Sequence, residues 1–252
     1  MIEIFILSTI QGITEFLPVS SSAHLILVSK YFDFHNQSLS IDVSLHIGSF
    51  LAVVVYFKKD VFSFFKNKKL FYKIFISSLP IMIVGYILIK FNLIYYLRNI
   101  KIIGWTTIIF GIILYYSDKF NNKKIIKSDF NFKSALIIGL FQILSLIPGV
   151  SRSGITITAG RFLEFKREDA AKISFLLSIP TLAAVSFFGI NNLLNGETFS
   201  FSITNLVAIT LSFFFSYVTI KYFLKYISNF SLNIFVVYRI LLGIIILILS
   251  YL

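Results

Sequence analysis

The chain has 252 residues, of which 57% are hydrophobic and only 13% are charged, and its formal net charge is +12. Soluble domains carry about 25% charged residues, so this chain has too few polar side chains to cover a water-exposed globule. That shortage excludes a soluble enzyme, a disordered segment and a coiled coil. The absence of cysteine excludes a disulfide framework and a zinc–thiolate site.

Eight apolar stretches follow one another along the chain. A membrane-spanning helix needs about 20 mainly apolar residues, and six stretches approach or meet that length. In chain order, the predicted elements are an interrupted stretch at 1–34, spans at 43–57, 74–89 and 102–116, a second interrupted stretch at 134–165, and spans at 173–190, 203–220 and 234–252. The sequence therefore predicts an all-α integral membrane protein with six transmembrane helices and two re-entrant helical hairpins.

The two interrupted stretches are broken near their middle by a polar cluster that contains proline. The first break reads LPVSSSAH at 17–24, and the second reads IPGVSRSG at 147–154. At membrane depth, an irregular backbone is tolerated only where it is buried in protein or lines a wet cavity. Each break is thus expected at the tip of a hairpin that lines an internal cavity.

The basic residues of the predicted loops are distributed unevenly. Segments 58–73, 117–133, 161–172 and 221–233 together hold 17 Lys and Arg, whereas the remaining connections hold 3. The positive-inside rule makes the first set cytoplasmic and places both termini outside the cytoplasm. In a membrane protein such residues also attract anionic lipid headgroups. Membrane lipids, and no nucleic acid, are therefore the expected partners of this charge.

The two halves of the chain resemble each other at an offset of 131 residues. QGITEFLPVSSSAH at 11–24 aligns with QILSLIPGVSRSGI at 142–155, with identical residues at four positions. The charge pattern starts the two halves on opposite sides of the membrane. We therefore predict one membrane domain, 1–252, made of two inverted repeats, 1–120 and 130–252, whose breaks meet near the bilayer midplane.

The first break carries an ionisable pair and a run of hydroxyls. Gln11 and Glu15 lie four residues apart and so share a helix face. Glu15 and His24 are ionisable groups within an apolar segment, which makes them functional candidates. A buried Glu–His pair that only holds helices together is the structural alternative. Ser20, Ser21 and Ser22 exceed the single hydroxyl that a helix cap needs.

The second break combines an arginine with glycines and hydroxyls at the expected start of a helix. Such a helix start suits an anion, and the guanidinium of Arg152 matches phosphate geometry. A structural ion pair between Arg152 and Glu15 is the alternative, and this pair can open for a substrate. The predicted phosphate-binding hydroxyls belong to Ser20, Ser22, Ser151, Ser153 and Thr156.

This set of side chains favours phosphoryl chemistry over peptide or ester chemistry. Glu15, helped by Gln11, offers oxygen ligands to Mg²⁺ or Ca²⁺. His24 is the expected general acid or base, and Ser21 is the expected nucleophile beside it. Arg152 is expected to stabilise the developing charge. His46 lies in a predicted span and can line the cavity, but a packed histidine is the more common interpretation.

At these residues the chain resembles the undecaprenyl-pyrophosphate phosphatase family of the bacitracin-resistance type. The family's first motif resembles Gln11, Glu15, the segment 18–21 and His24, and its PGxSRSxxT motif is matched at 148–156. Many members have Glu where this chain has Gln11, which weakens that residue as a metal ligand. The commoner Thr-Gly is replaced by Ser22 and Ala23.

The resemblance implies removal of the terminal phosphate from a C55 isoprenyl diphosphate lipid, which recycles the carrier for peptidoglycan synthesis and confers bacitracin resistance. It also implies a divalent cation and an active site open to the extracytoplasmic side of the bacterial cell membrane. Whether Ser21 forms a phosphoserine or water attacks directly stays open at this stage. So do the identity of the metal, the preferred lipid length and the oligomeric state, a homodimer included.

Two other functions compete with hydrolysis. Inverted repeats with broken helices are typical of transporters, so a flippase of an isoprenyl phosphate lipid is the main alternative. A nucleophile beside a base argues against it, because pure transport needs only anion binding. The acid-phosphatase type of lipid phosphatase needs a further histidine downstream, and no histidine follows His46.

Overall fold

The computed structural model describes residues 1–32, 38–66, 68–91, 93–97, 99–194 and 202–251, and this part of the chain is built from helices, as predicted. In chain order these are α1 (Ile2–Thr14), α2 (Ser21–Phe32), α3 (Leu39–Tyr56), α4 (Lys58–Lys66), α5 (Lys68–Lys90), α6 (Ile94–Leu97), α7 (Ile100–Asp118), α8 (Ile126–Asp129), α9 (Phe132–Ile143), the 3-10 helix η1 (Leu144–Leu146), α10 (Arg152–Phe162), α11 (Arg167–Leu194), α12 (Ile203–Asn229) and α13 (Asn233–Tyr251).

Six helices in the described ranges are long and apolar enough to cross a bilayer, and each contains most of one predicted span. They are α3, α5, α7, α11, α12 and α13. The predicted boundaries were too narrow, most clearly for α12, which continues to Asn229 and not to residue 220. Lys221 and Lys225 lie in this extension. A long lysine side chain can place its stem along apolar surface and its ammonium in water, so a charged residue need not end a spanning helix.

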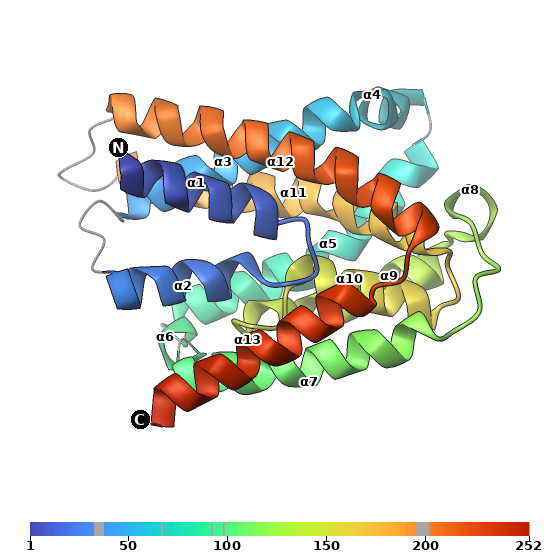
Figure 1. Ribbon diagram of the computed structural model, residues 1–252. Coiled ribbons are helices and arrows are strands. Elements are labelled where there is room, and N and C mark those ends of the chain that lie inside the picture. The colour runs from blue at the N-terminus through green and yellow to red at the C-terminus, as the bar shows by residue number, and fades with distance from the viewer. Residues whose placement is uncertain (33–37, 67, 92, 98, 195–201, 252) are drawn as a thin grey trace.

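The two interrupted stretches fold as helical hairpins that begin at opposite ends of the bundle (Figure 1). Helix α1 starts, and α2 ends, at the end that holds both chain termini, whereas α9 starts and α10 ends at the other end, beside α8. Contacts join the two helices within each hairpin. Their insertion into a bilayer as re-entrant segments stays a prediction. Residues 33 and 34 of the first predicted stretch lie outside the described residues.

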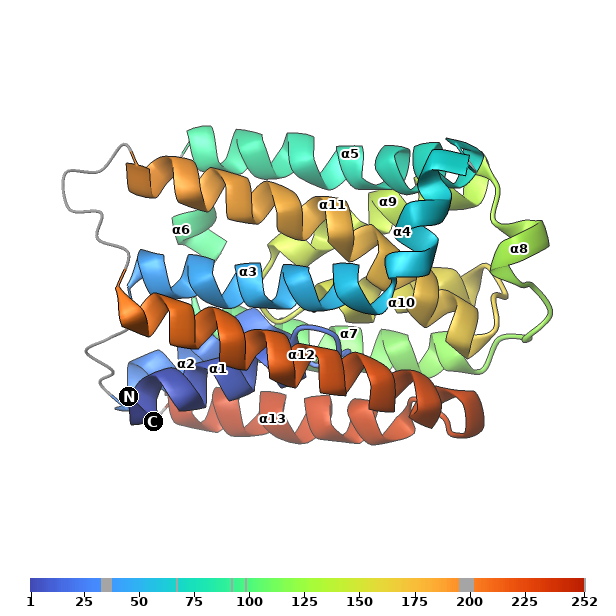
Figure 2. The same cartoon turned by 90° about the horizontal axis from the view of Figure 1, so that it is seen from above.

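The basic segments gather at one end of the bundle. Helices α4 and α8, the connection from α10 to α11 and the connection from α12 to α13 lie opposite the two termini (Figure 1). Figure 2 shows the same separation from above. This arrangement has the polarity that the loop charges predict, with both termini away from the basic end.

Close packing of small residues holds the first helix of each hairpin against a spanning helix. A Cβ atom added at Gly12 of α1 would lie 2.5 Å from Cβ of Phe215 on α12. One added at Gly139 of α9 would lie 2.3 Å from the carbonyl oxygen of Ser77 on α5. Glycine permits such backbone contact, which is how helices associate where hydrophobic driving force is weak.

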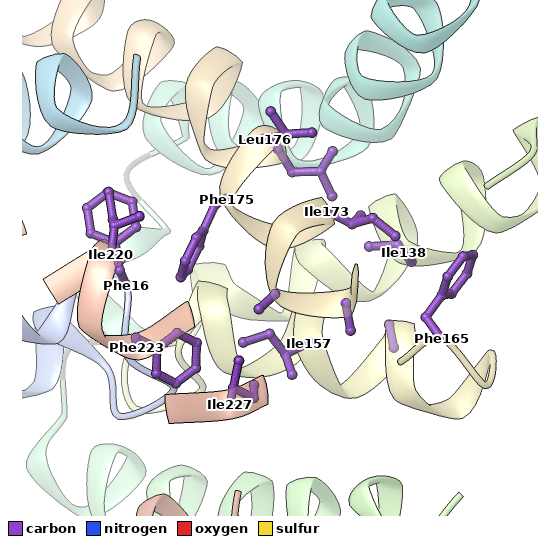
Figure 3. Close-up of a cluster of buried hydrophobic side chains, with 14 of the residues drawn as sticks. Phe16, Ile138, Ile157, Phe165, Ile173, Phe175, Leu176, Ile220, Phe223 and Ile227 are labelled. Carbon is purple, nitrogen blue, oxygen red and sulfur yellow. The ribbon is translucent and has the colours of Figure 1, made fainter. Parts of the chain in front are cut away.

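The main buried core anchors the first break. Phe16, directly after Glu15, is fully buried and meets Phe175 of α11 edge to face, with ring centroids 5.3 Å apart. Figure 3 shows these two rings beside Phe223 of α12. Aromatic pairs of this geometry contribute about 0.5–1.5 kcal/mol beyond their buried area. The core thus fixes the chain beside the carboxylate that the sequence analysis singled out.

Candidate active site

The two breaks share an unusual backbone feature. Ser20, just before α2, has φ of 75°, and Ser151, just before α10, has φ of 72°. Non-glycine residues seldom adopt positive φ, and each such residue costs on the order of 1–3 kcal/mol. The two serines are separated by the offset at which the halves of the sequence align. Equivalent strain at equivalent positions is what an inverted repeat predicts, although the repeat itself stays a prediction.

In each break, the hydroxyl of the strained serine lies close to the hydroxyl of a second serine. The Oγ atoms of Ser20 and Ser22 lie 3.3 Å apart, and those of Ser151 and Ser153 lie 3.2 Å apart. The hydroxyl of Ser151 also accepts the backbone N–H of Gly154 at 3.1 Å and so caps α10. Helix α2 therefore begins directly after Ser20 and helix α10 directly after Ser151, so the positive N-terminal ends of both helix dipoles lie at the breaks.

A carboxylate joins the two breaks. Nη2 of Arg152 donates to Oε1 of Glu15 at 3.0 Å, and both side chains are largely buried. Oε2 of Glu15 accepts the hydroxyl of Ser21 at 2.7 Å and Nε2 of Gln11 at 3.1 Å. The ion pair that the sequence analysis gave as an alternative is thus formed. The predicted carboxylate, serine and arginine form one hydrogen-bonded cluster.

This cluster opens onto a cavity of about 200 Å³. Its polar lining comes from Glu15, Ser20, Ser21, Ser22, His46, Ser145, Ser151, Arg152 and Thr181, and its apolar lining comes from Ile81, Leu146, Leu182 and Val185. Most of the predicted site residues therefore meet in one place. Sequence reasoning missed Ser145 and Thr181, whose hydroxyls lie in segments that read as ordinary apolar helix.

Two of the predicted phosphate ligands make hydrogen bonds that join parts of the fold. The hydroxyl of Ser153 donates to the carbonyl oxygen of Leu17 at 2.7 Å and ties the second break to the first. Thr156 donates to the hydroxyl of Ser174 on α11 at 2.7 Å and is fully buried. Neither residue lines the cavity, so in this structure both hold the breaks in place.

The ring nitrogens of His24 have hydrogen-bond partners other than Ser21, the nucleophile predicted beside it. Its Nδ1 lies 2.7 Å from the carbonyl oxygen of Ser20, which can only accept, so Nδ1 carries the proton. Its Nε2 lies 2.5 Å from the hydroxyl of Tyr238 on α13. Both ring nitrogens are engaged, and the residue does not line the cavity. The hydroxyl of Ser21 has Glu15, and not His24, as its hydrogen-bond partner.

Arg239 of α13 clamps the two breaks together through hydrogen bonds to their backbone carbonyl groups. It is fully buried, and it donates from Nη1 to the carbonyl oxygen of Pro18 at 3.3 Å and from Nη2 to that of Gly149 at 2.8 Å. Its Nε donates to the carbonyl oxygen of Thr107 on α7 at 3.2 Å. Pro18 and Gly149 are again equivalent at the repeat offset. The sequence pattern did not single out this arginine as a site residue.

Replacing Arg239 by methionine is expected to destabilise the protein by about 2–5 kcal/mol, because the three carbonyl groups lose charged donors in a buried place. Thermal unfolding of the purified protein in detergent measures the change. Leu241→Ala, on an exposed position of the same helix, is the control and should unfold near the wild-type temperature. An unchanged midpoint for Arg239→Met would contradict the clamp.

The structure also shows which side-chain oxygen atoms are available to the predicted cation. The described residues contain no group of three or more His, Asp or Glu placed to hold a metal. Glu15 is the carboxylate of the cavity, and Oε1 of the fully buried Gln11 has no hydrogen-bond partner. Mg²⁺ is often held by one or two carboxylates together with substrate phosphates. One carboxylate and one free amide oxygen fit that mode of binding, and they fit an all-protein cage poorly.

Comparisons with known proteins agree with the resemblance noted in the sequence. The family model described as "Bacitracin resistance protein BacA" matches residues 4–245. The chain is 54% identical over 252 residues to the undecaprenyl-diphosphatase of Pelagibacter ubique, covering 100% of this chain and 98% of that protein. It is 42% identical to undecaprenyl-diphosphatase 1 of Pseudoalteromonas translucida, covering 97% and 96%, and 41% identical to the undecaprenyl-diphosphatase of Aliivibrio salmonicida, covering 96% and 95%.

Proposed function

The chain belongs to the family of bacitracin resistance proteins, and we propose that it hydrolyses undecaprenyl diphosphate to undecaprenyl phosphate and phosphate. The names of its relatives give this substrate. One structural observation carries the assignment of the site: the hydroxyl of Ser21 donates to Glu15, which is paired with Arg152 at the wall of a single cavity. Release of undecaprenyl phosphate returns the lipid carrier to peptidoglycan synthesis and removes the lipid that bacitracin binds.

Arg152 and the serine hydroxyls are proposed to hold the diphosphate. Ser20, Ser22 and Ser151 line the cavity with the arginine, and α2 and α10 both begin there. Helix N-termini and guanidinium groups each favour a bound phosphate. The terminal phosphate competes with Glu15 for Arg152, so substrate binding frees the carboxylate. The ion pair therefore keeps the cavity charge balanced until the substrate arrives.

Ser21 is the proposed nucleophile and Glu15 its base. The hydroxyl oxygen of Ser21 attacks the terminal phosphorus while its proton moves to Oε2 of Glu15, 2.7 Å away. The bond to the bridging oxygen breaks, and undecaprenyl phosphate leaves with the bonding electrons. Water then attacks the phosphoserine and gives up a proton to the released phosphate, while Glu15 returns its proton to the serine oxygen. A direct attack by water uses the same base and the same phosphate ligands.

His24 is proposed to act through the backbone. By accepting the hydroxyl of Tyr238 and donating to the carbonyl oxygen of Ser20, it links α13 to the strained residue beside the nucleophile. It is therefore a positioning residue in this scheme, and its replacement is still expected to reduce turnover. Ser153 and Thr156 hold the second break in the same indirect way.

A divalent cation, Mg²⁺ or Ca²⁺, completes the proposal. Glu15 and the free Oε1 of Gln11 would hold it together with phosphate oxygens of the substrate. When bound, the cation neutralises charge on the diphosphate. Arg152 and the serine hydroxyls keep their proposed contacts with the diphosphate.

The apolar side of the cavity is proposed to receive the start of the isoprenyl chain. Ile81 of α5 and Leu182 of α11 line it, and Val185, also on α11, is 47% exposed. The wall thus continues to the outer surface of the bundle, where Figure 2 shows α5 and α11 side by side. A long isoprenyl chain can leave the cavity there and lie among membrane lipids.

The active site is proposed to open to the extracytoplasmic side of the bacterial cell membrane. Ile81 and Val185 lie in the halves of α5 and α11 that are farther from the basic end of the bundle. If the basic end is cytoplasmic by the positive-inside rule, these residues face the outer leaflet. Hydrolysis of the carrier lipid is then expected at that leaflet.

The first test is phosphate release from undecaprenyl diphosphate by the purified protein, with and without a chelator. We expect cation-dependent release of phosphate and undecaprenyl phosphate in equal amounts. Ser21→Ala should lower the rate at least tenfold, whereas Ser250→Ala, a serine near the end of α13, should not. Near wild-type turnover in Ser21→Ala would exclude the phosphoserine.

Transport is the second candidate, because the two broken helical segments start from opposite ends of the bundle (Figure 1). No phosphate release by folded protein supplied with Mg²⁺ or Ca²⁺ would favour it over hydrolysis. Movement of an isoprenyl phosphate lipid across liposomes would then be measured.

A further inference from the structure

His46 of α3 presents a free imidazole nitrogen beside the proposed site. Its Nδ1 lies 2.7 Å from the backbone carbonyl oxygen of Asp42, one turn earlier in the same helix. Because a carbonyl oxygen only accepts, Nδ1 carries a proton, and Nε2 is the nitrogen left for other partners. The residue lines the cavity, and no other hydrogen bond of this ring occurs among the described residues.

The position of His46 also suits an anion electrostatically. It lines the same cavity as Glu15 and Arg152. A diphosphate monoester carries more negative charge than one arginine balances, particularly while Glu15 is ionised. A phosphate oxygen that keeps its proton, held by a hydrogen-bond acceptor at this wall, lowers that charge.

The other candidate histidine cannot fill this place without rearrangement. His24 uses Nδ1 for the carbonyl oxygen of Ser20 and Nε2 for Tyr238, and it lies outside the cavity lining. Of the two histidines in the described residues, the one with a free nitrogen is the one at the cavity. The sequence pattern pointed to the opposite choice.

We propose that His46 is a diphosphate-binding residue, whose Nε2 accepts a hydrogen bond from a protonated phosphate oxygen of the substrate. This inference rests on the proposed function for the identity of the substrate. No bond is made or broken at His46. Its effect is to hold the diphosphate against Arg152 and the serines, so a side chain with a suitably placed amide group can replace it.

The test compares His46→Ala with His46→Gln. Loss of one hydrogen bond to a charged group should lower kcat/KM of His46→Ala for undecaprenyl diphosphate about ten- to hundredfold. His46→Gln should stay within about fivefold of wild type, because the glutamine amide oxygen can accept the same hydrogen bond. Leu51→Ala, at an exposed position of the same helix, is the matched control and should behave like wild type.

Binding of inorganic diphosphate provides a readout that needs no turnover. Its dissociation constant, measured by calorimetry on the detergent-purified protein, should rise about tenfold or more in His46→Ala and little in His46→Gln. Wild-type affinity in a folded His46→Ala would overturn the inference, as would a glutamine variant as poor as the alanine variant. If the wild-type protein binds diphosphate through His46 yet releases no phosphate, the proposed function fails and this inference stands.

Discussion

Replacing Arg152 by alanine is expected to lower kcat/KM for undecaprenyl diphosphate about a thousandfold. Arg152 donates to Glu15 across the two breaks and lines the cavity. Removing it deletes the fixed cation that the transferring phosphate would meet, and the loss of one such group typically costs 10²- to 10³-fold or more in rate. Steady-state phosphate release measures the effect.

A lysine at position 152 should recover only part of this loss. Its ammonium keeps the charge, but it cannot form the two parallel hydrogen bonds of a guanidinium. Lys225→Ala, which removes an exposed cation near the basic end of α12, controls for net charge and should leave turnover unchanged. If folded Arg152→Ala turned over within threefold of wild type, the arginine would have no direct part in phosphate binding.

The hydrophobic pattern was sufficient to predict the long apolar helices. In the described residues, all six spans and both interrupted stretches appear as helices in their predicted places, because apolar length is a strong constraint in a bilayer. The ends of the helices were less predictable. Charged residues can continue a helix beyond its apolar part, and α11 begins at Arg167 and not at residue 173.

The composition of the site was predictable where its residues lie close together in the sequence. Glu15 and Ser21 belong to the first break and meet in the structure, and Arg152 joins them from the matching position of the second break. The repeat supplied this last link, since equivalent segments of an inverted repeat are expected to face each other.

The partners of the histidines could not be predicted, because they depend on long-range packing. Tyr238 is 214 residues from His24, and its hydroxyl is the partner of Nε2 of that ring. The Ser20 carbonyl oxygen takes the other. Arg239 is a comparable case, since its three acceptors come from three separate segments. A sequence shows that a buried cation must have partners, but it does not identify them.

Replacing Glu15 by glutamine is expected to lower kcat about 10²- to 10⁴-fold with a smaller change in KM. The amide keeps the size of the side chain and can still accept a hydrogen bond from Ser21, but it cannot take the proton at Oε2. Rapid-mixing experiments on saturated enzyme separate this chemical step from substrate binding. Binding of inorganic diphosphate should persist in the variant, which shows that the cavity is intact.

The double variant Glu15→Gln with Arg152→Ala tests whether the two residues act as one unit. In the proposed scheme both residues act on the same phosphoryl transfer, Glu15 on the serine proton and Arg152 on the phosphate, so losing either one already disables the shared step. The loss in kcat/KM should therefore be far smaller than the product of the two single losses, as for other residues that work together. Strictly multiplicative losses would mean that Glu15 and Arg152 serve separate steps, and that their contact in the free protein only stabilises the fold.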